Sequence, residues 1–301
     1  MSLPALVAAP HRGLNHTARA LLWMAASGAL YSLLNALLRS MSLGMSPFQT
    51  LSLAYGCTLP LMLPLVLRLG PRRFLPRDTK GLLVRGTVHW LGMCLWLVAV
   101  TGITLAETTA IGFTTPLFVM IGAATLLKEP FRWPRAVATL VGFAGMIVIL
   151  VPRLGGTRSG NHALLMLAAA GVFAASFLLS KRLTRTERPS VIVVWQSLIV
   201  TILSIPLAVL SWQRPSTTAL VTALGCGVLT TVGNYCLTRA FTEADISASQ
   251  PAKFLDLIWA CLLGWLFFGD VPETTTLVGG VIILAATVWV AHREGRSTYV
   301  P

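Results

Sequence analysis

Apolar stretches of about twenty residues recur along almost the whole chain, separated by short polar segments. A run of about 18 apolar residues already suggests a helix that spans a membrane. The chain has 301 residues, of which only 11% are Asp, Glu, Lys or Arg, whereas soluble proteins use roughly 25%. A chain of this size with so little charge cannot cover an apolar core with polar surface. The sequence therefore predicts an all-α membrane protein.

Ten transmembrane helices account for the apolar stretches. Pro47 and Pro189 are expected to begin the second and seventh, because the first turn of a helix does not use the N–H that proline lacks. Pro116 and Pro251 are expected to interrupt the fourth and ninth. The predicted spans are 18–38, 47–67, 82–101, 106–127, 134–151, 162–180, 190–211, 217–238, 246–268 and 274–291.

Basic residues gather on one side of this predicted arrangement. The net charge of +13 could by itself indicate nucleic-acid binding. With the N-terminus in the cytoplasm, however, the cytoplasmic segments hold eighteen of the 23 Lys and Arg residues, Arg85 among them, and the outer segments hold four. Positive charge on the cytoplasmic side is the usual rule for membrane proteins. We therefore predict both termini in the cytoplasm, a bacterial inner membrane as the location, lipid as a partner and no nucleic acid.

The two halves of the chain are related. A shift of 141 residues superposes Gly86 on Gly227, Gly92 on Gly233, Ala99 on Ala240, Thr101 on Thr242, Phe113 on Phe254 and Glu129 on Asp270. Five helices in each half place the second half upside down, which predicts two inverted five-helix repeats, an architecture typical of transporters. The expected segments are an N-terminal cytoplasmic tail (1–17), a first repeat (18–151), a linker (152–161), a second repeat (162–292) and a C-terminal tail (293–301).

Two signatures carry a resemblance to a known family. The first half has Ala106-Glu107, Phe113, Pro116-Leu117-Phe118, Glu129, Arg132-Trp133, Gly142 and Gly145. The second half has Arg239-Ala240, Pro251, Phe254, Trp259-Ala260, Gly264, Phe268-Gly269-Asp270, Pro272 and Gly279. Together these resemble EamA-type transporters of the drug/metabolite transporter superfamily, which implies movement of small metabolites such as amino acids, riboflavin, S-adenosylmethionine or amino-acid-derived metallophores. Many relatives carry an arginine where this chain has Ala54, whose repeat mate is Gln196.

Charged side chains inside a membrane are costly and are functional candidates by default. Lys253 and Asp256 are three residues apart and therefore share one face of the ninth helix, with Gln250 one turn earlier. One interpretation is that the pair binds cargo, with Lys253 on a carboxylate or phosphate and Asp256 on a cation or proton. Alternatively, the two charges neutralise each other and fix helix packing.

Other polar or aromatic residues at membrane depth are weaker candidates. Glu107 lies near the outer end of the fourth helix, and a carboxylate there can also be hydrated. His89 is either a titrating group or a packing residue, and Asn234, Tyr235 and Trp259 are either ligands or interhelical contacts. Glu129 and Asp270 precede a helix in each repeat and are expected to cap it.

No motif for hydrolysis, metal binding or nucleotide binding is present, so the sequence predicts a transporter without cofactor or metal, and no particular oligomeric state. We expect a secondary exporter of an amino acid or an amino-acid-derived zwitterion, such as an opine-type metallophore. The alternative is an importer of a vitamin-like metabolite such as riboflavin, or of S-adenosylmethionine. A remote alternative is an intramembrane enzyme that uses His89, Glu107 and Asp256.

The charge asymmetry makes a topological prediction. Reporter domains fused at Gly102 and Gly155 should lie outside the cytoplasm, and those fused at Arg77 and Arg185 should lie inside. Paired alkaline phosphatase and fluorescent-protein fusions measure this. The reverse pattern, or two adjacent loops on one side, would contradict the arrangement.

Overall fold

The computed structural model describes residues 16–42, 44–100, 102, 111–129, 132–150, 160–256, 258–259, 262 and 274–297. Regular structure within these ranges is helical, which confirms the all-α fold. The elements are α1 (His16–Ser42), α2 (Pro47–Gly56), α3 (Thr58–Leu69), η1 (Pro71–Phe74), α4 (Thr79–Ala99), α6 (Thr115–Thr125), α7 (Trp133–Leu150), α8 (Gly160–Leu183), α9 (Pro189–Leu210), α10 (Thr217–Glu243), α11 (Ile246–Ser249), η3 (Gln250–Phe254) and α13 (Thr274–Ser297).

The outer surface of the described helices is apolar. Six spans in these ranges are long and apolar enough to cross a membrane, and three shorter apolar helices accompany them. Large apolar side chains such as Leu126, Leu210 and Val281 are exposed, while polar ones such as Gln49, Gln196 and Thr230 are buried. Apolar groups outside and polar groups inside are the arrangement expected in lipid, where water does not satisfy polar groups.

Proline decides where the second and seventh spans begin. Pro47 and Pro189 lie in the first turns of α2 and α9, as predicted. The predicted span 47–67 corresponds to one apolar span, Pro47–Leu69, whose helix has a one-residue break at Cys57 between α2 and α3. Pro60 cannot bond the carbonyl of Gly56, and its ring clashes with that carbonyl, so the break falls where the proline requires it.

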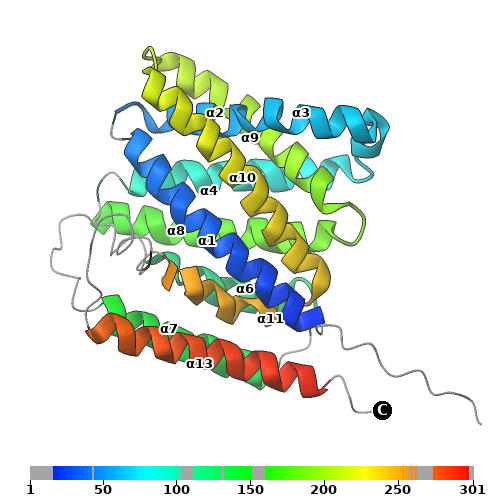
Figure 1. The fold of residues 1–301 in the computed structure, drawn as a ribbon, viewed down its shortest axis with the longest axis vertical. Helices are drawn as coiled ribbons and strands as arrows, with labels where there is room; N and C mark the ends of the chain where they lie inside the picture. Colours follow the sequence, from blue (N-terminus) through cyan, green and yellow to red (C-terminus); the bar gives the residue numbers. More distant parts are fainter. Residues whose placement is uncertain are drawn as a thin grey trace, which may run out of the picture.

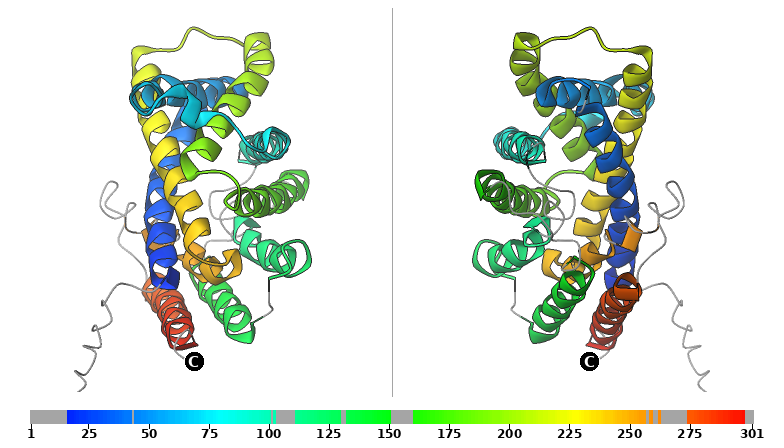
Figure 2. Two further views of the ribbon diagram at one scale, coloured as in Figure 1. Left: turned by 90° about the vertical axis from the view of Figure 1, so that its right-hand side faces the viewer. Right: turned by 90° about the vertical axis from the view of Figure 1, so that its left-hand side faces the viewer.

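Two walls of helices face each other. Figure 1 shows α1 and α10 lying side by side, with α11 near their lower end. The opposite wall consists of α4, α8 and α6, and Figure 2 shows the two walls from their edges. The α2–α9 pair and the α7–α13 pair join the walls at the two ends. Each of the two walls therefore contains helices from both halves of the chain.

The contacts repeat when the two halves are exchanged. This exchange turns the α1–α10 contact into α8–α4 and the α2–α10 contact into α9–α4, and all four contacts are present. The α2–α9 and α7–α13 contacts map onto themselves. Such a pattern is what two repeats related by a twofold axis produce. The described helices therefore carry the predicted inverted repeat in their packing.

Two of the glycines that match between the repeats have a packing reason. A methyl group at Gly227 of α10 would lie 3.0 Å from the backbone carbonyl carbon of Cys57, where α2 ends. A methyl group at its mate, Gly86 of α4, would lie 2.7 Å from the Cδ1 atom of Ile199 in α9. Both glycines thus allow the same symmetry-related helix crossing to be close.

Substitution of Gly227 tests this crossing. Gly227→Val should destabilise the protein by about 1–3 kcal/mol, because the obstacle is backbone and cannot rotate away. Gly171→Val is the matched control, since a Cβ there meets nothing within 4 Å. Thermal unfolding of both variants in detergent measures the difference. Equal melting temperatures would show that the α2–α10 crossing is not tightly packed.

Candidate functional site

The ninth helix is broken near its start, as Pro251 predicts. Four α-helical residues (α11) are followed by the 3-10 segment η3, which contains Pro251. Side-chain hydrogen bonds surround the break: Ser249 Oγ and Gln250 Nε2 both donate to Ile246 O at 2.8 Å. Thr287 Oγ of α13 donates to Pro251 O at 3.3 Å. The break is therefore a satisfied, built feature.

Lys253 and Asp256 form the predicted pair just after this break. Lys253 Nζ lies 2.9 Å from Asp256 Oδ2, and the two side chains are 14% and 23% exposed. Asp256 Oδ1 is buried and has no partner. That oxygen lies against Gly28 of α1, where the carboxylate would clash with any Cβ. The small residue in α1 is what lets the carboxylate enter between the walls.

Tyr31 of α1 interacts with this pair and with a second polar cluster, which consists of Tyr55, Arg85 and His89. Lys253 Nζ lies 5.5 Å from the centre of the Tyr31 ring. The Tyr31 hydroxyl also interacts electrostatically with Arg85, Tyr55 and Asp256. In the second cluster, Tyr55 Oη lies 2.9 Å from His89 Nε2.

His89 is therefore engaged by protein groups. Its other ring nitrogen, Nδ1, lies 3.4 Å from Ser176 Oγ, and its ring packs 5.7 Å from that of Phe173. With both ring nitrogens in contact with hydroxyls, His89 orients its neighbours, notably Tyr55. This geometry favours the packing interpretation of His89 over a titrating role.

Arg85 is the residue that sequence reasoning missed. It was counted with the cytoplasmic segments, whereas the structure buries it in the second turn of α4 with 1% of its surface exposed. Its Nη1 donates to Gln196 Oε1 of α9, while Arg85 Nε and Nη2 have no partner. The signal was Asp78, whose side chain accepts from Gly81 N at 2.9 Å and so starts α4 at Thr79, three residues earlier than predicted.

The remaining predicted residues are scattered. Trp259 belongs to the pair's surroundings, because its Cδ1 would lie 3.5 Å from a Cβ at Gly28. Asn234 is buried in α10, with Nδ2 donating to Thr230 O at 2.9 Å. Tyr235 is 40% exposed and stacks edge-on against Trp23, apart from the central groups. Glu107 lies outside the described residues, and Gln250 uses its amide on the break in helix 9.

Glu129 does cap a helix, but not the one that follows it. Its carboxylate accepts from Ile246 N at 3.0 Å and from Ser247 N at 3.3 Å, at the start of α11. Ser247 Oγ also donates to it at 2.7 Å. The expectation that Glu129 caps the helix that follows it, α7, is therefore wrong, because its carboxylate accepts from the first N–H groups of α11 instead. Its repeat mate Asp270 falls outside the described residues.

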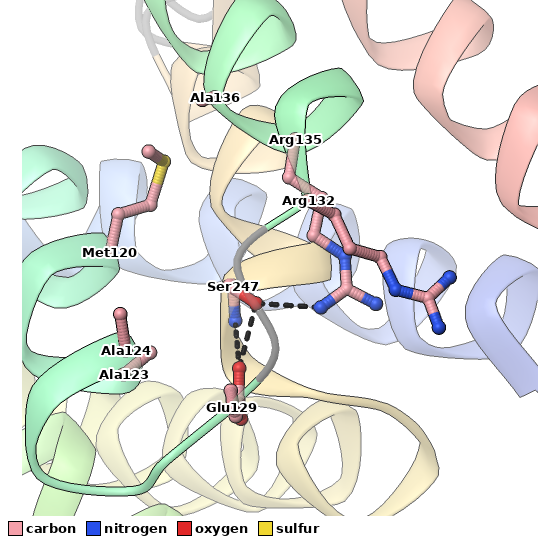
Figure 3. A pocket seen from close by; sticks show the side chains of 8 residues that line it. All are labelled: Met120, Ala123, Ala124, Glu129, Arg132, Arg135, Ala136 and Ser247. Carbon is pink, nitrogen blue, oxygen red and sulfur yellow. Dashed lines mark hydrogen bonds between the residues drawn. The ribbon is translucent and has the colours of Figure 1, made fainter.

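Arg135 completes this network, which Figure 3 shows around a pocket between α6, α7 and α11. Arg135 Nη1 lies 2.8 Å from Ser247 Oγ and 3.0 Å from Asp245 Oδ2. The network ties the first repeat to the second at one end of the molecule. Three polar residues of its lining, Glu129, Arg135 and Ser247, already form this network, so we assign the pocket a structural role.

The central groups offer hydrogen bonds and charge but no metal site. Among the described residues, no three His, Cys, Asp or Glu side chains come together. Lys253 and Asp256 form an ion pair near Tyr31, and Arg85 supplies a further buried charge. Buried charge of this kind is typical of cargo sites in membrane proteins.

The sequence profile of the EamA-like transporter family matches residues 18–151 and 161–291. This match covers nearly the whole chain. The chain belongs to the EamA-like transporter family. It is thus a multi-pass transporter of small molecules, in the drug/metabolite transporter superfamily.

Relatives of this EamA-like chain differ in their named cargo. It is 33% identical to a riboflavin transporter of Rhizobium johnstonii, over 93% of each chain. It is 29% identical to an S-adenosylmethionine uptake transporter of Rickettsia prowazekii, over 71% of this chain and 72% of the relative. It is also 29% identical to a pseudopaline exporter of Pseudomonas aeruginosa, over 69% and 73%.

A solved crystal structure confirms the fold. It superposes on this EamA-like chain with a TM-score of 0.78, covering 93% of this chain and 99% of that one, at 20% sequence identity. At this identity the likeness speaks for the arrangement of the helices. The cargo has to be argued from the residues of the site.

Removal of the Glu129 cap makes a stability prediction. Glu129→Ala leaves the buried donors at Ile246 and Ser247 without an acceptor and should cost about 1–3 kcal/mol. Glu129→Gln keeps one acceptor oxygen and should cost less. Glu243→Gln is the control, because Glu243 pairs with the exposed side chains of His16 and Arg19. Thermal unfolding ranks the three variants, and a loss for Glu243→Gln equal to that for Glu129→Ala would contradict the cap.

Proposed function

We propose that this chain is a secondary transporter of an amino acid or an amino-acid-derived zwitterion, which it exports across the bacterial inner membrane with both termini in the cytoplasm. The observation that carries the proposal is the Lys253–Asp256 pair between the two halves of the molecule. It supplies charge of both signs where inverted repeats place their cargo.

The surroundings of Asp256 support cargo binding more strongly than they support mutual neutralisation of the pair. One carboxylate oxygen bonds Lys253 at 2.9 Å, and the other is buried without a partner. A buried acceptor without a donor costs about 1–3 kcal/mol, which a pair serving only as packing would avoid. An ammonium group of the cargo would satisfy this oxygen.

The relatives support small polar cargo of this kind. S-adenosylmethionine carries an amino-acid group, and pseudopaline is derived from amino acids, so two of the named cargoes fit a site with both charges. The pseudopaline relative is named an exporter, which supports the outward direction. The excess of basic residues on one side supports the proposed orientation of the termini.

Uptake of riboflavin or a similar vitamin is the second candidate. The riboflavin relative matches 93% of both chains, a longer match than the other two. In addition, the indole N–H groups of Trp90 and Trp259 are buried without acceptors. A flat heterocycle with ring nitrogens and carbonyls would both stack on such indoles and accept from them.

Mutation of Lys253 and Asp256 distinguishes a role in cargo binding from a role in packing. Lys253→Met and Asp256→Asn should each lower transport at least about tenfold, a loss of about 1.4 kcal/mol or more in cargo stabilisation. The double variant should fold and stay inactive, since removing both charges leaves no uncompensated charge behind. The measurement is uptake of labelled amino acids, S-adenosylmethionine and riboflavin into inverted and right-side-out vesicles.

Controls make the outcome decisive. Glu243→Gln changes an ion pair at the helix end and should transport normally. Wild-type rates in the double variant would reduce the pair to a packing element. Uptake of riboflavin alone would replace the first candidate with the second, and an imposed pH gradient without effect would remove proton coupling at Asp256.

A further inference from the structure

We propose that Arg85, positioned by Gln196, is a carboxylate-binding residue of the cargo site. This inference deepens the proposed function, because it rests on cargo entering between the two walls. It assigns the two charged ends of a zwitterion to two places: the carboxylate to Arg85 and the ammonium group to Asp256.

The guanidinium presents an open edge. Nη1 is occupied by Gln196 Oε1, whereas Nε and Nη2 are buried and have no partner. Nε and Nη2 form one edge of the planar guanidinium group, and an N–H bond of each points outward from that edge in nearly the same direction. This edge matches the two oxygens of a carboxylate in a bidentate pair. Gln196 therefore orients the group and leaves its bidentate edge free.

The charge of Arg85 is also uncompensated. Only 1% of the residue is exposed, and none of the described carboxylates lies within salt-bridge distance of it. Its electrostatic partners are the hydroxyls of Tyr31 and Tyr55, which are neutral dipoles. A buried cation without a counter-ion is strongly unfavourable. An anionic group of the cargo would pair with this cation and remove the cost. Binding of the cargo would therefore stabilise the protein relative to its empty state.

Lys253 is the rival for the carboxylate, and its contacts argue against it. Its ammonium group is already 2.9 Å from Asp256 Oδ2 and lies 5.5 Å from the centre of the Tyr31 ring. A carboxylate at Lys253 would compete with Asp256 for the same charge. Arg85 carries no such commitment.

Tyr31 places the two subsites in one region. Its hydroxyl is close enough to be influenced by the charges of both Arg85 and Asp256, and its ring centre lies 5.5 Å from Lys253 Nζ. The unsatisfied groups at the two ends are therefore complementary to a single zwitterion: two donors at Arg85 and one acceptor oxygen at Asp256. A neutral ring would leave the charge of Arg85 uncompensated, which is why the proposal commits to a carboxylate.

The test uses the purified full chain and a probe pair of equal shape. Benzoate carries a planar carboxylate and benzamide its neutral counterpart. Benzoate at saturating concentration should raise the melting temperature of the wild-type protein by about 3 °C, and benzamide should not. Arg85→Gln should abolish the shift, whereas the exposed control Arg185→Gln should keep it.

A second variant, Gln196→Glu, keeps the test valid if Arg85→Gln fails to fold. A carboxylate at this position pairs with Arg85 and should raise the melting temperature of the unliganded protein, while abolishing the benzoate shift and lowering zwitterion transport at least tenfold. A stabilised protein that no longer binds cannot be explained by misfolding.

The outcomes separate this inference from the proposed function. An equal shift with benzoate and benzamide, a shift that survives Arg85→Gln, or no shift at all would overturn the carboxylate site. A benzoate shift that depends on Arg85, combined with uptake of riboflavin alone in vesicles, would keep the anion site and overturn the proposed zwitterion cargo instead.

Discussion

The absence of water around the spanning helices governs this structure, because every polar group there has to find its partner within the protein. The break after α2 obeys this rule, since Thr58 Oγ donates at 2.5 Å to Tyr55 O. The break in the ninth helix obeys it through Gln250 and Thr287. Several buried polar atoms nevertheless lack a partner, and among these the atoms of Arg85 and Asp256 belong to charged groups, which makes them the strongest candidates for contact with a ligand.

The inverted repeat is carried by the places where helices cross. Gly86 and Gly227 occupy equivalent positions in the two repeats. Each lies in the third helix of its half (α4 and α10) and allows that helix to approach the second helix of the other half (α9 and α2). The crossing therefore links the halves twice, in symmetry-related ways. Glu129, by contrast, links them through a buried carboxylate that reaches 117 residues along the chain to Ile246.

Much of the fold could be predicted from the sequence, because span length and proline position are local properties. The starts of α2 and α9 at Pro47 and Pro189 are examples. The partner of Glu129 could not be predicted, because a cap supplied from a distant segment leaves no local pattern. The role of Arg85 was hidden by a three-residue error in the start of α4, and Tyr31 was hidden because an aromatic residue looks alike toward lipid and toward the interior.

Arg85 also has a consequence for the energetics of the membrane as a whole. A guanidinium without a counter-ion is a charge on which the transmembrane potential acts, at about 2.3 kcal/mol per 100 mV for one full charge across the full field. The Lys253–Asp256 pair is neutral and feels little of this force. Any rearrangement that moves α4 through part of the field while Arg85 is unpaired therefore carries electric current.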